Sequence, residues 1–175
     1  MEEVILVDIE DSIVGQMEKL EAHKKGLLHR AFSILLFNEA GELLLQQRAL
    51  GKYHSGGLWT NTCCSHPYPN ESVKDAAHRR IVEEMGIKTN LEFVFKFIYE
   101  AKLDHDLTEH EFDHVFLGTF NDAPKINPEE VNDWKWMNME SISQDIQTNP
   151  DNYTIWFKDI MKNQKLTNSI DLLLK

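Results

Sequence analysis

The sequence predicts an α/β sandwich, in which helices flank a mixed β-sheet. Three observations support this fold class. Apolar runs typical of strands fill most of the middle of the chain, and segments with helical periodicity separate and follow them. The chain has 175 residues, of which 42% are hydrophobic, so it can bury a core without disulfide bonds. We therefore expect a single domain over residues 1–175.

The chain before residue 66 is expected to consist mainly of strands and turns. Short apolar runs indicate strands, and Gly, Asn and Asp mark the positions where the chain turns. One helical turn is expected at residues 17–23, ending before Gly26. In order, the other expected elements are a strand at 4–7, a turn or hairpin at 8–15, strands at 29–38 and 42–48 that pair across a turn at 39–41, a loop at 51–57, and a bent strand at 59–65.

The strongest helix prediction covers residues 72–85. Ser72 and Asp75 form a capping-box pattern at its start, and Gly86 is a natural stop after its last residue. Apolar positions recur every four residues, which gives the stripe that a helix packs against a sheet. These positions are Val73, Ala77, Ile81 and Met85.

The rest of the chain is expected to return to the sheet and then to form helices. Strands are predicted at residues 91–102, 111–120 and 131–137, and a helix at 141–147. A second helix is predicted at 152–163, where Trp156 and Ile160 are among the apolar residues. The tail, residues 165–175, could cap the domain or make a contact.

Charge and cysteine content limit the partners of this protein. The formal net charge is −11, which argues against nucleic acid because such binding rests on neutralising phosphates. A small phosphorylated substrate would need only a local cluster of Lys and Arg. Cys63 and Cys64 are adjacent, so they form no disulfide framework and favour a reducing compartment. We expect a monomer or a homodimer.

The N-terminus and the hydropathy pattern predict a cytoplasmic protein. Residues 1–10 carry three acids and lack the basic region and long apolar run of a signal peptide. No apolar stretch approaches the roughly 18 to 20 residues that would span a bilayer. We therefore expect no membrane partner.

The predicted helix carries a motif that resembles the Nudix box, a loop–helix–loop that binds a divalent metal and a diphosphate. Glu71, Arg79, the pair Glu83–Glu84 and the pair Gly86–Ile87 fall in register with that box. The resemblance implies a Nudix-like α/β/α sandwich with a mixed sheet. The alternative is a solvated helix with ordinary salt bridges.

Two positions depart from the box. Ser65 stands where the motif has glycine, and Arg80 stands where it has the first glutamate of its R-E-x-x-E-E core. Arg80 places a cation one helical turn from Glu84, so the site loses metal-binding charge and gains a phosphate donor. This change favours holding a diphosphate over cleaving it.

The segment T-N-T-C-C-S-H-P, residues 60–67, narrows the resemblance to the type 1 isopentenyl-diphosphate isomerases, which carry T-N-x-x-C-x-H-P here. Further segments that look like this family are R-A-F-S at residues 30–33, R-A-L at 48–50 and E-H-E at 109–111. The resemblance covers residues 4–156. The loop 54–57 and Ser65 are local variants, and we expect neither to touch a residue with a chemical role.

Histidines and carboxylates in this chain have a spacing that suits a divalent metal. Cys64 and His66 are two residues apart, as are Glu109 and Glu111, so each pair faces one side of a strand. Imidazoles and carboxylates together suit Zn²⁺, Mn²⁺ or Fe²⁺. By resemblance, the ligands of a Mn²⁺ or Zn²⁺ are His23, His29, His66, Glu109 and Glu111.

Each of these residues also has an ordinary structural explanation. A lone histidine at the end of a strand is usually hydrogen-bonded or on the surface, and Glu109 and Glu111 could form a solvated edge. A second candidate metal site is the tract that contains His105, His110 and His114. Its histidines do not share a two-residue or four-residue face, which disfavours it.

The resemblance implies a 1,3-allylic proton shift that interconverts isopentenyl diphosphate and dimethylallyl diphosphate. Such a shift needs an acid, a base and a shelter for carbocation character. By resemblance, Cys64 and Glu111 transfer the protons, Tyr99 assists Glu111, and Trp156 faces the cation. Cys64 and Trp156 could equally be core residues.

A diphosphate requires cations. By resemblance, Lys19, Arg48, Lys52 and Arg80 bind it, and a Mg²⁺ bridges it to Glu84. Otherwise these side chains would be solvated, which is the usual state of Lys and Arg.

Two other functions remain open. The first is a Nudix hydrolase of a nucleoside or prenyl diphosphate, which the box supports and Arg80 opposes. The second is an acidic metal-binding or interaction domain without catalysis, which Cys64, Glu111 and Tyr99 oppose.

Overall fold

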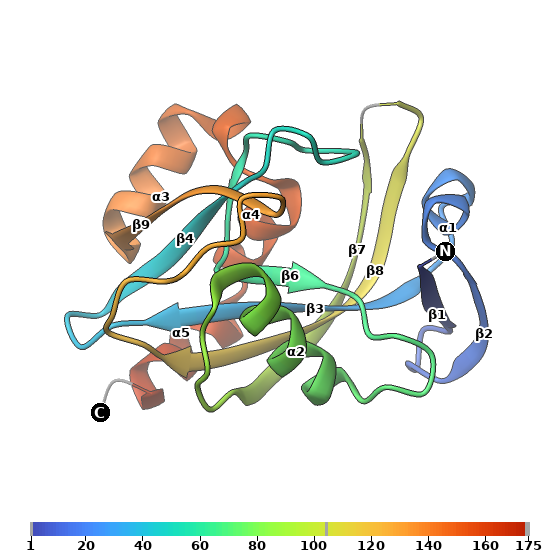
Figure 1. The fold of residues 1–175 in the computed structure, drawn as a ribbon, viewed down its shortest axis with the longest axis horizontal. Coiled ribbons are helices and arrows are strands. Elements are labelled where there is room, and N and C mark those ends of the chain that lie inside the picture. Colours follow the sequence, from blue (N-terminus) through green and yellow to red (C-terminus); the bar gives the residue numbers. More distant parts are fainter. Residues whose placement is uncertain (1, 104, 174–175) are drawn as a thin grey trace.

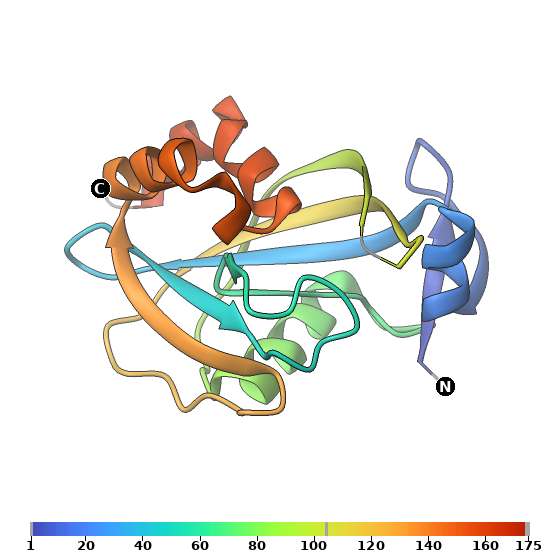
Figure 2. The same cartoon turned by 90° about the horizontal axis from the view of Figure 1, so that it is seen from above.

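The computed structural model describes residues 2–103 and 105–173. Within these residues one mixed sheet lies between two helical layers, with α2 on one face and α3, α4 and α5 on the other (Figures 1 and 2). The strands are β1 (Glu3–Val7), β2 (Ile13–Glu18), β3 (His29–Phe37), β4 (Glu42–Arg48), β5 (Trp59–Thr60), β6 (Cys63–Ser65), β7 (Glu92–Lys102), β8 (Thr108–Thr119) and β9 (Val131–Asn138). The helices are α1 (Lys19–Lys25), α2 (Val73–Met85), α3 (Met139–Thr148), α4 (Ile155–Lys162) and α5 (Gln164–Leu173), with a 3₁₀ turn at Pro150–Asn152.

β3 is the central strand of the sheet. It pairs in parallel with β8 along its whole length and antiparallel with β1, β4 and β6. Its run of apolar residues fits this position, because a strand covered on both faces is apolar throughout. The parallel register places His29 opposite Glu111 and Phe37 opposite Thr119.

The two faces of β3 belong to two separate hydrophobic cores. Leu35 and Phe37 point toward α3, α4 and α5, where they pack with Phe157 and Ile160. The residues of β3 that alternate with Leu35 and Phe37 point toward α2 and pack with its apolar stripe. The prediction of an α/β sandwich with a mixed sheet is therefore confirmed.

The best-predicted helix has the expected ends. The Ser72 hydroxyl accepts a hydrogen bond from the Asp75 N–H at 3.1 Å, and Gly86 closes the helix with φ +66°. Ala77, Ile81 and Met85 are buried, as the four-residue repeat predicts. The box helix is thus held against the sheet by its apolar stripe and fixed at both termini.

Three local predictions were wrong. Residues 17 and 18 belong to β2 and not to a helix, which begins only at Lys19, where the Glu18 carboxylate accepts the N–H groups of Leu20 and Glu21. The strand predicted at 111–120 begins at Thr108, so Glu109 is a strand residue. The helix predicted from residue 152 begins at Ile155, because Pro150–Asn152 forms a 3₁₀ turn before it.

The predicted tail is largely α5. Leu166 is buried, and Ile170 and Leu173 pack against the core beneath α3 and α4. Residues 174 and 175 of the tail lie outside the described part of the chain. Within the described residues, no helix combines the length and apolar composition that crossing a bilayer requires.

The left-handed backbone of Gly86 gives a stability prediction. A Cβ at this position would lie 2.7 Å from the Lys125 carbonyl oxygen, and its φ of +66° is costly for any other residue. We expect Gly86→Ala to lower the free energy of unfolding by about 1–3 kcal/mol in a urea titration. The control Gly15→Ala, whose nearest neighbour is a Leu6 methyl at 3.9 Å, should change it little; equal losses in both variants would contradict the argument.

Candidate active site

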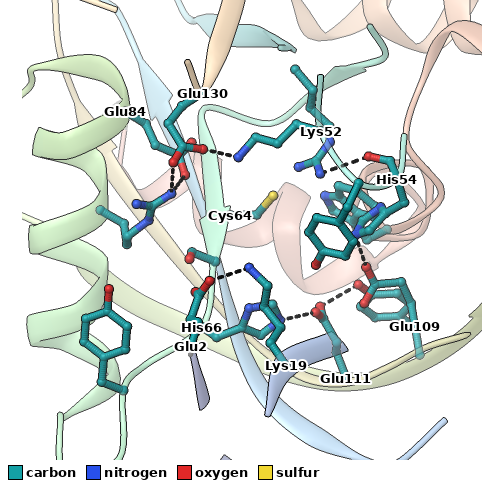
Figure 3. A pocket seen from close by; sticks show the side chains of 17 residues that line it. Glu2, Lys19, Lys52, His54, Cys64, His66, Glu84, Glu109, Glu111 and Glu130 are labelled. Atoms are coloured by element: carbon teal, nitrogen blue, oxygen red, sulfur yellow. Dashed lines mark hydrogen bonds and ion pairs between the residues drawn. The ribbon is translucent and has the colours of Figure 1, made fainter. Parts of the chain in front are cut away.

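A cavity of about 310 Å³ opens beside the sheet where β6 and β8 approach the N-terminal segment. All of the predicted site residues line it except His23 and His29, which lie fully buried next to it. Figure 3 shows its labelled side chains converging from several elements, with Cys64 between the carboxylates Glu84 and Glu130 on one side and Glu109 and Glu111 on the other.

One end of the cavity is a buried group of imidazoles and carboxylates. The His66 Nε2 lies 2.7 Å from the Glu111 Oε1, and the His29 Nε2 lies 3.6 Å from the same oxygen. The His23 Nε2 lies 3.4 Å from the Glu109 Oε2. One ligand atom from each of His23, His29, His66 and Glu111 falls within 4.8 Å of the others.

Backbone carbonyls orient two of these imidazoles. The His23 Nδ1 donates to the Lys19 carbonyl at 2.7 Å, and the His29 Nδ1 donates to the Leu27 carbonyl at 2.8 Å. Each Nε2 is therefore directed into the group, where a neutral ring would offer its lone pair to a cation.

The chemistry of this group fits a divalent cation. The His23 Nε2, the His29 Nε2 and the Glu109 Oε2 are buried without hydrogen-bond partners, which is costly unless a cation fills the space between them. Burial raises the pKa of Glu111, but the neighbouring imidazoles of His29 and His66 outweigh it and hold that pKa well below its ordinary value. Neutral imidazoles with ionised carboxylates are ligands of Zn²⁺, Mn²⁺ and Fe²⁺.

Strand pairing places the proposed proton carriers on one face of the sheet. Cys64 pairs with Ser33 on β3, and Tyr99 on β7 pairs with Glu111 on β8. The Tyr99 hydroxyl donates to the Glu111 Oε2 at 2.5 Å. Burial, opposed by Arg48 and reinforced by the charge of Glu84, raises the pKa of the Cys64 thiol to about 12.

The predicted cations line the cavity from more than one side, with Arg80 and Lys52 at the end of Glu84 and Glu130, and Lys19 beside Glu2 and His66 (Figure 3). The Arg80 Nη2 lies 2.5 Å from the Glu84 Oε1 and 3.2 Å from the Glu130 Oε1, and Lys52 also pairs with Glu130. Lys19 pairs with Glu2 at 2.6 Å. The guanidinium of Arg48 lies over the Trp156 ring at 5.3 Å from the ring centroid.

Arg79 and Glu71 of the box have a structural role. The Arg79 Nε and Nη2 donate to the two oxygens of Glu71, each at 2.8 Å, and this fixes the loop before α2 to the helix. Neither residue lines the cavity, and neither does Glu83, which pairs with Arg79 and Arg80.

Sequence analysis missed five cavity residues: Glu2, Tyr53, His54, Tyr68 and Glu130. The expectation that loop 54–57 touches no residue with a chemical role was wrong, because the His54 Nε2 lies 3.1 Å from the Glu109 Oε1. The proximity of Lys52 in the same loop was the available signal, but only the fold brings residue 54 to residue 109. No comparable signal marked Glu2 or Glu130.

The alternative histidine tract does not come together as a group. His105 is exposed, the His110 Nδ1 contacts the Gly26 carbonyl at 3.0 Å, and the His114 Nε2 contacts Asp11 at 2.9 Å. Asp104, which belongs to this tract, lies outside the described residues.

Comparison with known proteins decides the family. A family model described as "NUDIX domain" matches residues 27–157. Isopentenyl-diphosphate Delta-isomerase 2 of Aromatoleum aromaticum is 51% identical over 155 residues, which are 89% of this chain and 82% of that protein. Isopentenyl-diphosphate Delta-isomerase of Serratia proteamaculans is 49% identical over 161 residues, 92% of this chain and 90% of that protein. The chain belongs to the isopentenyl-diphosphate Delta-isomerases of the Nudix superfamily.

Solved structures place this isomerase in the same fold. A Deinococcus radiodurans protein aligns with a TM-score of 0.72 at 16% identity, over 99% of this chain and all of that one (100%). The MutT protein of Methanosarcina mazei aligns with a TM-score of 0.64 at 21% identity, over 83% of this chain and 94% of that one. At these low sequence identities, the similarity shows only that the proteins share the Nudix fold.

The raised pKa of Cys64 predicts a slow reaction with alkylating reagents. A thiol with a pKa of about 12 holds very little thiolate at pH 8, and the thiolate is the reactive form. We expect iodoacetamide to alkylate Cys64 of the chelator-treated isomerase at least roughly 100-fold more slowly than free cysteine. Mass spectrometry of peptides would follow the reaction, and a rate near that of free cysteine would refute the raised pKa.

Proposed function

We propose that this cavity catalyses the interconversion of isopentenyl diphosphate and dimethylallyl diphosphate, with the diphosphate at the cationic end and the alkene beside Cys64 and Glu111. The observation that carries the proposal is that one cavity joins a cation cluster to a buried pair of proton carriers. The names of the relatives supply the substrate class. The chain's residues supply the chemistry.

The cationic end suits a diphosphate. Lys19, Arg48, Lys52 and Arg80 all line the cavity, and guanidinium and ammonium groups bind phosphate oxygens through charge-assisted hydrogen bonds. Glu84 is buried, and the Gln46 amide donates to its Oε2 at 2.9 Å, which fixes the carboxylate in place. A Mg²⁺ bound with the diphosphate would take Glu84 as its protein carboxylate.

Cys64 and Glu111 are the proton-transfer groups of the proposed reaction. One group protonates the terminal carbon of the alkene and the other removes a proton from the carbon next to the diphosphate-bearing one, so that the double bond moves by one position. The Tyr99 hydroxyl holds the Glu111 carboxylate and can pass a proton to it. A free, reduced Cys64 is needed, which agrees with the reducing compartment expected from the sequence.

Trp156 and the adjoining apolar core shelter the carbocation character. Trp156 is buried and lines the cavity, and it packs with the core that contains Phe95 and Phe157. Its π face attracts positive charge, and the surrounding apolar side chains exclude the water that would capture a cation.

The residues that would hold a Zn²⁺ or Mn²⁺ are His23, His29, His66, Glu109 and Glu111. When bound, the ion supplies positive charge beside Glu111 and so sets the acidity of that carboxyl group. The protein's own part is to keep the imidazoles oriented and to hold the Glu111 Oε2 on the Tyr99 hydroxyl.

The hydrolase alternative is disfavoured by the position of Arg80. Its guanidinium fills the space between Glu84 and Glu130, where a Nudix hydrolase would need further carboxylates for metals that activate water. Glu83 does not line the cavity and is paired with both Arg80 and Arg79.

Replacement of Cys64 tests the proposed proton transfer. We expect Cys64→Ala to lower the isomerisation rate about 100-fold or more, because a proton carrier is removed while the cavity remains. Proton NMR in D₂O with Mg²⁺ would follow the appearance of dimethylallyl diphosphate that carries solvent deuterium, with phosphate release measured in parallel. The neighbouring variant Cys63→Ala, whose side chain is buried away from the cavity, should keep most of the activity. Full activity of Cys64→Ala would disprove this role, and phosphate release by the unaltered protein would favour the hydrolase.

Replacement of Arg80 tests the diphosphate end. We expect Arg80→Gln to raise the KM for isopentenyl diphosphate about 10-fold or more, because a charge-assisted hydrogen bond is lost. Lys74→Gln removes the same charge from an exposed position on α2 and should leave KM unchanged. An unaltered KM in Arg80→Gln would remove Arg80 from the binding site.

A further inference from the structure

His54 is a buried imidazole that the proposed reaction does not use. It lies in the loop between β4 and β5 and is 5% exposed. Its Nε2 lies 3.1 Å from the Glu109 Oε1, and Figure 3 shows the two side chains directed toward each other. A buried imidazole in contact with a candidate metal ligand calls for a functional explanation, because burying a polar ring is costly.

The two oxygens of Glu109 have different surroundings. The Oε1 faces His54, whereas the Oε2 faces the His23 Nε2 at 3.4 Å and has no hydrogen-bond partner. A donor on one oxygen of a carboxylate fixes its rotation and leaves the other oxygen for a cation. His54 is therefore placed to select which oxygen of Glu109 faces the imidazoles.

The contacts of the two ring nitrogens of His54 indicate where its proton lies. The Nε2 faces a carboxylate oxygen, which can only accept, so a hydrogen bond between them requires the ring proton on Nε2; the Ser55 hydroxyl, 3.2 Å from the Nδ1, can donate to that second nitrogen. The ring is held in this orientation by Trp156, whose ring it meets edge-on at 86°, with a centroid distance of 5.9 Å.

The backbone of His54 is tied to the other end of the cavity. Its carbonyl accepts a hydrogen bond from the Arg48 Nη2 at 3.2 Å, and Lys52 lies two residues before it in the same loop. The loop therefore contacts the candidate metal ligand Glu109 through the His54 side chain. It also carries Lys52, a proposed diphosphate-binding cation.

We propose that His54 is a positioning residue, which donates a hydrogen bond to Glu109 so that the Glu109 Oε2 is directed at the metal, and which thereby joins the loop of Lys52 to the metal site. This inference rests on the metal site of the proposed function. A direct ligand role is the competing explanation, since one ligand atom from each of His23, His54 and Glu109 also falls within 4.8 Å of the others.

Two replacements separate these roles. His54→Leu keeps the bulk and removes the donor, whereas His54→Gln places an amide N–H near the position of the lost Nε2. Loss of an outer-shell partner weakens metal binding by about 10- to 100-fold. We expect this loss in His54→Leu and largely restored affinity in His54→Gln, because the amide donates to Glu109 as the imidazole does.

The measurement is Zn²⁺ affinity of the whole, chelator-stripped protein, by competition with a chromophoric chelator. His78→Leu on α2 is the matched control, since it removes an imidazole outside the cavity and should leave the affinity unchanged. Thermal melting of the stripped variants confirms that each is folded before titration.

The outcomes are distinguishable. Zn²⁺ binding by the unaltered protein, weakened in His54→Leu and restored in His54→Gln, supports the proposal. Unchanged affinity in His54→Leu overturns the role of His54 and leaves the metal site intact. Equal losses in the Leu and Gln variants overturn positioning in favour of direct ligation. Absence of Zn²⁺ binding by the unaltered protein overturns the inference together with the metal site.

Discussion

The parallel pairing of β3 with β8 is the constraint around which the candidate site of this isomerase is built. Its register sets His29 opposite Glu111, and the same strand face then continues through Ser33 to Leu35. Because side chains alternate across a strand, a shift by one residue would turn this whole set to the opposite face. The candidate ligands His29 and Glu111 and one hydrophobic core therefore depend on a single register.

That shared face changes in character along its length. At one end it presents imidazoles and carboxylates, and at the other it merges with the apolar core beneath α4. Cys64 and Tyr99 lie at the boundary, partly packed against that core while facing the polar cavity. A reaction that moves protons on a hydrocarbon needs both surroundings within a few ångströms, and this boundary supplies them.

Sequence patterns predicted the elements whose signals are local. The α2 helix and its caps depend on neighbours within a few residues, and so does the β3–β4 hairpin. β2 was missed because Ile13 and Val14 are exposed on an edge hairpin, so no buried apolar pattern marks it. The α5 helix was not predicted, although Leu166, Ile170 and Leu173 recur at helical spacing and give a local signal for it.

The residues of the site that escaped prediction share one physical property: they act through partners distant in the chain. Nothing near Glu130 in the sequence indicates its pairing with Lys52 and Arg80, and nothing near His54 indicates Glu109. The family resemblance identified site residues that belong to recurring sequence motifs. It could not supply those whose importance arises only from the folded geometry.

Three of the four candidate diphosphate-binding cations are already paired with carboxylates, so substrate binding there would be an exchange of partners. Lys19, Lys52 and Arg80 are already neutralised by Glu2, Glu130 and Glu84. A diphosphate that entered alone would leave the buried Glu84 without its cation, which is costly, and a Mg²⁺ that entered alone would displace Arg80 in the same way. In the proposed site, a Mg²⁺ that entered with the diphosphate would offset part of the added negative charge and would give the released carboxylates a new partner. The proposed site would therefore favour a diphosphate that arrives with its divalent cation over the bare anion.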